Sequence, residues 1–102
     1  MSMVNIKRPS GYRTKQAVIL HYLTFDGSLN RFEAERIGDH CLHSTISTFR
    51  NNYGLTVLDE FESVPNLTGS YTDVKRYWIE SASKSQAKKL LSLWRVKPKV
   101  KL

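Results

Sequence analysis

LNRFEAERIGDHCLHSTISTFRNNYGL, residues 29–55, contains two short helical patterns separated by a tight break. The first pattern opens with Asn30, whose side-chain oxygen can accept hydrogen bonds from backbone amides of the first turn. Glu33 follows three residues later, where its side chain can reach back to the start of the helix. Gly38 stands where a helix would end in a left-handed residue. The sequence therefore predicts a helix over about 31–37 that begins with a capping box.

A second helix is predicted between the break at residues 39–41 and Gly54. Its apolar residues recur at spacings of four, three and four, which places them on one stripe of a helix. They are Leu42, Ile46, Phe49 and Tyr53. Two short helices joined by so brief a break indicate a helix-turn-helix.

The other side of this second helix carries small hydrogen-bonding groups and no carboxylate. No acid occurs anywhere from Leu42 to Val57. Phosphates repel carboxylates, whereas Asn, Ser, Thr, His and Arg can bond base edges or phosphate oxygens in a major groove that admits a helix. The alternative is a merely solvated polar face, because acid-free stretches of this length are common under ordinary composition. The polar face holds Ser44, Ser47, Thr48 and Asn51, flanked by His43, Thr45 and Arg50.

A β-hairpin is predicted after Gly54, because the spacing of apolar residues changes to two. One strand is expected over about 56–63, followed by the turn-rich segment VPNLTGSYT and a returning strand over about 73–80. Neighbouring residues of a strand point to opposite sides. We therefore expect Tyr77 and Ile79 to face the core and Trp78 to be partly exposed.

Two roles remain open for Lys75 and Arg76 on the returning strand. They can bond phosphates or enter a minor groove, or they can pair across the hairpin with acids of the first strand. Those acids can form a solvated, aggregation-resistant edge or a site for a basic partner. They are Asp59, Glu60 and Glu62.

One domain over residues 13–95 is predicted between a flexible basic arm, residues 1–12, and a basic tail, residues 96–102. Thr14 can cap a first helix that is apolar around most of its circumference and ends at residues 26–27. Residues 28–30 can supply a short strand-pairing segment. Ser83 and Gln86 predict a second capping box, which opens a helix that packs on the first helix. Its apolar stripe is Ala87, Leu90, Leu91 and Trp94.

The distribution of charge predicts a polyanionic partner. The formal net charge is +7, yet residues 1–80 carry nine Lys or Arg and nine Asp or Glu. The whole excess lies in residues 81–102, so the C-terminus is expected to help hold the partner, with Lys97 and Lys99 as candidate contacts.

Other features exclude several classes of protein. No segment approaches the roughly 18 apolar residues of a membrane span, and the N-terminus lacks the apolar core of a signal peptide. Cys41 is the only cysteine, so we expect a cytoplasmic protein and a small buried thiol in the turn. The spacing of His40, Cys41 and His43 argues against zinc. No phosphate loop or nucleophile elbow is present, and we expect no enzyme activity, metal or cofactor.

Several residues outside the polar face carry a resemblance to a known family. They are Leu29, Arg31, Glu33 and Ala34, then Ile46, Phe49, Tyr53 and Gly54, then Tyr77 and Ile79. Over about residues 14–80 the chain resembles the small winged helix-turn-helix proteins of bacteriophages and prophages. The resemblance implies an α+β fold with a three-helix core, a β-hairpin wing and a C-terminal amphipathic helix.

The resemblance also implies a function. The third helix would enter the major groove of double-stranded DNA with His43, Ser44, Ser47, Thr48, Arg50 and Asn51, while the wing and basic tail contact the backbone. A phage-encoded transcriptional regulator or accessory DNA-binding factor of the host cytoplasm or nucleoid is expected, as a homodimer if its site is palindromic. One alternative is an interaction module that docks on a host transcription or replication protein through the acidic strand and Trp78. Another is binding of RNA or single strands.

Overall fold

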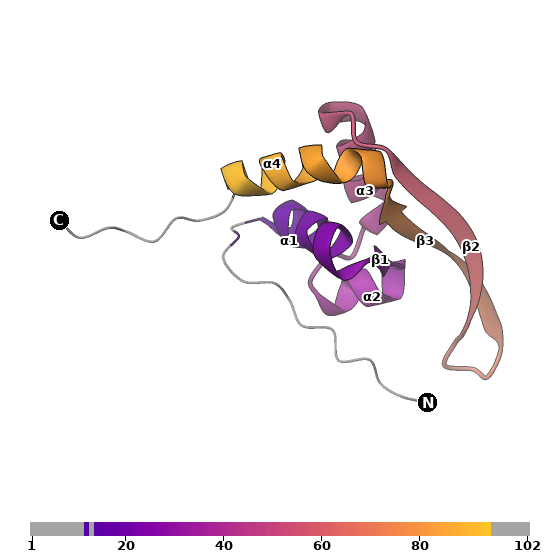
Figure 1. Cartoon of the computed structure of the whole chain (residues 1–102). Helices are drawn as coiled ribbons and strands as arrows, with labels where there is room; N and C mark the ends of the chain where they lie inside the picture. Colours follow the sequence, from indigo (N-terminus) through magenta and orange to yellow (C-terminus); the bar gives the residue numbers. More distant parts are fainter. Residues whose placement is uncertain (1–11, 13, 95–102) are drawn as a thin grey trace.

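The computed structural model describes Tyr12 and residues 14–94. The helices of this part gather at one end of a long β-hairpin, which projects beyond them (Figure 1). The first half contains α1 (Lys15–His21), the π-helical turn η1 (Tyr22–Asp26), β1 (Ser28–Leu29), α2 (Arg31–Arg36) and α3 (Leu42–Tyr53). The second half contains β2 (Val57–Pro65), β3 (Tyr71–Ile79), the 3-10 turn η2 (Ser81–Ser83) and α4 (Lys84–Trp94). The predicted basic arm, except for Tyr12, and the predicted tail lie outside the described residues.

The sheet has three antiparallel strands in the order β1-β3-β2. Strands β2 and β3 pair from Val57 opposite Ile79 to Pro65 opposite Tyr71, which confirms the predicted hairpin and extends both strands toward the turn that connects them. Strand β1 pairs with Trp78 and Tyr77, which confirms that the short segment before α2 joins the sheet. The fold is therefore α+β, as the sequence predicts.

The core centres on α1, as its nearly continuous apolar sequence predicts. Ile19 and Leu20 are fully buried, and α4 packs against α1 with Ala87 and Leu91 buried on its inner side. From the sheet, Tyr77 and Ile79 point inward, whereas Trp78 is half-buried, as the alternation of strand residues predicts.

Hydrogen bonds at the helix ends confirm three of the predicted boundaries. The Thr14 side chain accepts from the Ala17 amide at the start of α1. Asn30 and Glu33 form the capping box of α2, each accepting from the other's backbone N–H at 3.0 Å. Gly54 ends α3 in the left-handed conformation, with φ 63°, where a side chain would be strained.

The predicted capping box at the start of α4 is wrong. Ser83 lies in the preceding 3-10 turn, and its hydroxyl accepts from the Thr56 amide at 2.9 Å. The Gln86 side chain donates to the Tyr53 carbonyl at 2.6 Å. Both side chains therefore bond to other elements, because the start of α4 lies against the end of α3 and its connection to β2.

Removal of the Asn30 side chain should destabilise the fold by about 1–2 kcal/mol. This residue is only 4% exposed; besides the cap, its amide donates to the Glu62 carboxylate of β2 at 3.1 Å. Asn30→Ala therefore breaks a helix cap and a link between helix and hairpin together. Urea unfolding monitored by circular dichroism measures the loss. Asn52→Ala, at an exposed site of α3, is the matched control and should leave the midpoint nearly unchanged. Equal midpoints for the two variants would contradict this role of Asn30.

Candidate nucleic-acid interface

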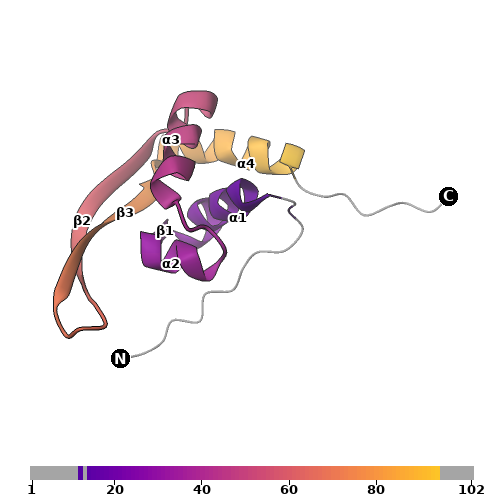
Figure 2. The ribbon, with the colours of Figure 1, turned by 180° about the vertical axis from the view of Figure 1, so that it is seen from behind.

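The outer side of α3 is exposed. Seen from behind, α3 lies on the near side of the molecule, with α1 and α4 further back and the hairpin sweeping away beside it (Figure 2). Among the predicted contact residues on this helix, Ser44, Ser47 and Asn51 are exposed, as is His43 in the first turn, while Thr48 is half-buried. The structure therefore brings most of the predicted polar face together on one open surface.

Hydrogen bonds within α3 organise this polar face. The Asn51 side-chain amide donates to the Ser47 hydroxyl at 3.1 Å, one turn earlier in the helix. The Thr48 hydroxyl donates to the Ser44 carbonyl at 3.1 Å. Helix α3 contains no Asp or Glu. The surface thus offers neutral hydrogen-bond donors and acceptors and no negative charge that would repel a polyanion.

Thr45, predicted on the edge of the polar face, is instead buried, with 6% of its surface exposed. Its hydroxyl donates to the carboxylate of Asp39, which also accepts from the Cys41 amide at 2.9 Å. Asp39 itself is buried in the turn between α2 and α3. A residue three positions after Leu42 falls beside the apolar stripe of the helix. Thr45 therefore fixes the turn and does not present its side chain to a partner.

Arg50, the one arginine of α3, is used within the protein. Its guanidinium donates to the Val57 carbonyl from both Nε, at 3.1 Å, and Nη2, at 2.5 Å. The same Nη2 lies 2.9 Å from the Asp59 carboxylate. The guanidinium also lies 5.9 Å from the centre of the Tyr77 ring. Burial is the main cause that raises the pKa of Tyr77, and the negative charge of Asp59 adds to it, whereas Arg50 acts to lower that pKa. Arg50 thus joins α3 to the base of the hairpin.

Arg76 is held between α2 and the hairpin. Its guanidinium lies 2.9 Å from Glu33 and 2.8 Å from Glu62, and it donates to the Ser28 hydroxyl at 2.9 Å. Burial acts to lower the pKa of Arg76, but the hydrogen bonds and charges of Glu33 and Glu62 outweigh it and raise that pKa. Of the two roles left open by the sequence, pairing with acids is the one found for Arg76.

Lys75 is held less tightly. Its ammonium lies 4.0 Å from the Asp59 carboxylate and 5.3 Å from the centre of the Phe61 ring, and its side chain remains 42% exposed. The ammonium can therefore reach a second anion without leaving a buried carboxylate unpaired.

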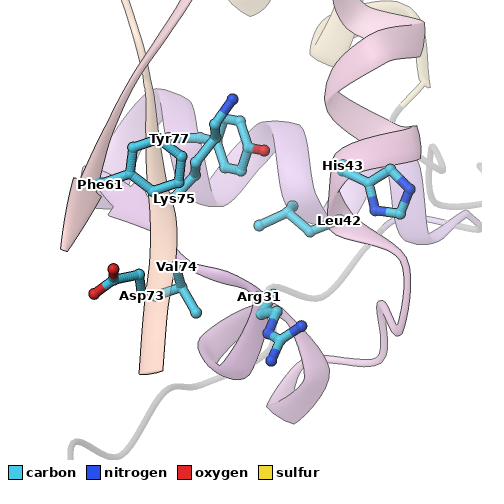
Figure 3. A pocket seen from close by; sticks show the side chains of 8 residues that line it. All are labelled: Arg31, Leu42, His43, Phe61, Asp73, Val74, Lys75 and Tyr77. Atoms are coloured by element: carbon cyan, nitrogen blue, oxygen red, sulfur yellow. The ribbon is translucent and has the colours of Figure 1, made fainter. Parts of the chain in front are cut away.

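A shallow hollow of about 250 Å³ lies between the starts of α2 and α3 and the hairpin (Figure 3). Arg31 lines it from α2 and Lys75 lines it from β3. Arg31 is exposed, and its guanidinium lies 4.8 Å from the centre of the Phe32 ring. Neither Arg31 nor the exposed Phe61 is among the site residues that the sequence predicts. No local pattern signals their proximity, because it depends on how the hairpin lies against the helices. The hollow is lined by Arg31, Leu42, His43, Phe61, Asp73, Val74, Lys75 and Tyr77.

The predicted burial of Cys41 is wrong. Its thiol is exposed at the start of α3, 3.2 Å from the Ser44 hydroxyl. Over the described part of the chain, no three His, Cys, Asp or Glu side chains are grouped so that they could hold a metal ion. Within the same part, no helix has the length and apolar character needed to cross a bilayer. Lys97 and Lys99 lie outside the described residues.

Arg50→Ala should destabilise the protein by about 1 kcal/mol or somewhat more. Hydrogen bonds to a charged group are strong, but the Arg50 guanidinium is partly exposed, and solvent weakens its interactions. Thermal unfolding by calorimetry measures the loss. Arg31→Ala removes an exposed arginine without such bonds and should cost less, within about 0.5–1 kcal/mol. A smaller loss for Arg50→Ala than for Arg31→Ala would show that the bridge to β2 contributes little.

No protein-family model, curated protein or solved structure significantly matches this chain. The positions and contacts of its own residues are therefore the basis for inferring a function.

Proposed function

We propose that this chain is a phage-type winged helix-turn-helix protein that binds double-stranded DNA with α3 in the major groove, rather than an enzyme. It would serve as a transcriptional regulator or accessory DNA-binding factor. The observation that carries the proposal is the open, carboxylate-free side of α3, where Ser44, Ser47 and Asn51 are exposed. A groove about 12 Å wide accepts a helix in this orientation.

The arrangement of α2 and α3 supports the proposal. A recognition helix must keep its orientation while it is pressed against DNA, and here the turn before α3 is locked by the buried Asp39 carboxylate. The other end of α3 is held to β2 by Arg50 and to α4 by the bond from Gln86 to Tyr53. Rigid elements present base-reading groups with less loss of entropy on binding.

The hollow beside α3 supports contacts with the DNA backbone. Sugar–phosphate strands border the major groove, and contacts to phosphate fix the register of a protein on the duplex. Arg31 of α2 and Lys75 of β3 both line the hollow between the helices and the hairpin. In the proposed complex these two residues bind phosphate, while Arg50 and Arg76 keep the helix and hairpin in place. The basic tail adds attraction that does not depend on sequence.

A carboxylate placed on the polar face should weaken duplex binding. In Ser47→Glu the new charge would lie where α3 meets phosphates and base edges, and affinity for a pool of random duplexes should fall about tenfold or more. Fluorescence anisotropy with labelled duplexes measures the affinity, and circular dichroism verifies that the variant is folded.

Ser81→Glu is the matched control, because it makes the same substitution at an exposed serine outside both α3 and the basic tail. Its affinity should stay within a factor of about two or three of the unmodified chain, because the new charge does not lie on the polar face of α3 and is screened by salt. Equal affinities for the two glutamate variants, or no binding of the unmodified chain to any duplex, would contradict the proposal.

Neutralising the tail should change the salt dependence of binding. Replacing Lys97, Lys99 and Lys101 by Gln should weaken binding to all sequences alike and reduce the slope of log K against log salt by about 0.9 for each phosphate that the tail no longer neutralises. Titrations at several salt concentrations provide the slope. An unchanged slope would remove the tail from the interface while leaving the proposed role of α3 intact.

The exposed apolar side chains of the hairpin favour a second candidate function, docking on another protein. Phe61 is 71% exposed, Tyr71 is 72% exposed and Leu67 is fully open. If the chain docks on another protein, the unmodified chain and Ser47→Glu should both capture a host transcription or replication protein. This capture should persist after nuclease treatment. Capture should be abolished in the double variant Phe61→Ser, Tyr71→Ser.

A further inference from the structure

We infer that Asn51 recognises adenine in the major groove, so that the preferred duplex carries an adenine where the last turn of α3 meets the base pairs. This inference rests on the proposed function and deepens it by naming the feature of the DNA that is read. It follows from the position of Asn51, from the chemistry of its neighbours and from the internal bonds that remove the competing arginine.

In rotation about the axis of α3, Asn51 lies at the centre of the exposed side, and along the axis it lies in the last turn. Each residue of a helix is rotated by about 100° from the one before it. Measured from the buried stripe of Leu42, Ile46 and Phe49, Asn51 is on the far side, in line with Ser47 one turn earlier. Asn52 is rotated onward, toward the flank that contains the buried Thr45. Only one of the two adjacent asparagines therefore faces outward at the centre.

Among the described residues of this face, Asn51 has the chemistry best suited to distinguishing bases. A side-chain amide carries an acceptor oxygen and a donor N–H in one plane, which match the N6 and N7 positions of adenine. The hydroxyls of Ser44 and Ser47 can bond any base, so they distinguish bases weakly. Arginine would select guanine, but Arg50 is bound to the Val57 carbonyl and the Asp59 carboxylate.

Ser47 orients the amide for this contact. One N–H of Asn51 donates to the Ser47 hydroxyl at 3.1 Å. The amide has two N–H groups, so its oxygen and second N–H remain available for the base edge. The internal bond restricts the side chain before DNA arrives, which reduces the entropy lost on binding.

The test begins with selection from random duplexes by the full chain, followed by titration of the selected site. At the adenine assigned to Asn51, replacement by each other base should weaken binding about five- to 150-fold, as expected for one two-point contact. Replacement by 7-deaza-adenine, which lacks only the N7 acceptor, should weaken binding in the same direction. Asn51→Ala should bind all four versions of the site within about twofold of one another, and Asn52→Ala should keep the adenine preference.

Selection of a site without a preferred adenine would overturn the inference, and so would an adenine preference that survives in Asn51→Ala. Insensitivity to 7-deaza-adenine would do the same. In each of these outcomes duplex binding itself persists, so the proposed function would stand. Absence of binding to every duplex would overturn both.

Discussion

The arrangement of helices and hairpin depends on one cluster of charges around Arg76. Its guanidinium lies between Glu33, which belongs to the capping box of α2, and Glu62 of β2. The buried Asn30 amide joins the same cluster by donating to Glu62. An isolated two-stranded hairpin is marginally stable in water. This cluster and the short strand β1 give the hairpin a fixed direction relative to α2, and removal of any one member would leave a charged or polar group without its partner.

The internal use of two arginines also shapes the surface that remains. Arg50 and Arg76 are both neutralised by carboxylates, so the hairpin and α3 contribute little free positive charge. If the protein binds DNA, attraction must then come mainly from Arg31, Lys75 and the basic C-terminus, while selectivity must come from neutral groups on α3. Attraction by phosphate charge is independent of sequence, whereas contacts with base edges are not. Affinity and selectivity would therefore reside in different parts of this chain.

Local patterns in the sequence predicted most of the fold. The caps at Thr14 and Asn30 and the stop at Gly54 depend on neighbours within a few residues, and the structure confirms all three. The errors concern side-chain partners that a helical or strand pattern does not encode. Ser83 bonds the Thr56 amide instead of capping α4, and Thr45 is buried because Asp39 offers a carboxylate inside the turn. Such partners become visible only when the packing is known, which is also why the hollow between Arg31 and Lys75 had no signal in the sequence.

The link through Arg50 couples the position of α3 to that of the hairpin base. Its guanidinium bonds the Val57 carbonyl at the first residue of β2, and Val57 is itself buried in the core. A rotation of α3 would stretch these bonds, and a rotation of the hairpin base would pull on the same residue. A partner that fits the polar side of α3 must therefore also fit the hollow beside it, because their relative position is set before binding. The position of the hairpin then restricts how a duplex can lie along α3, even where the hairpin makes no contact with a base.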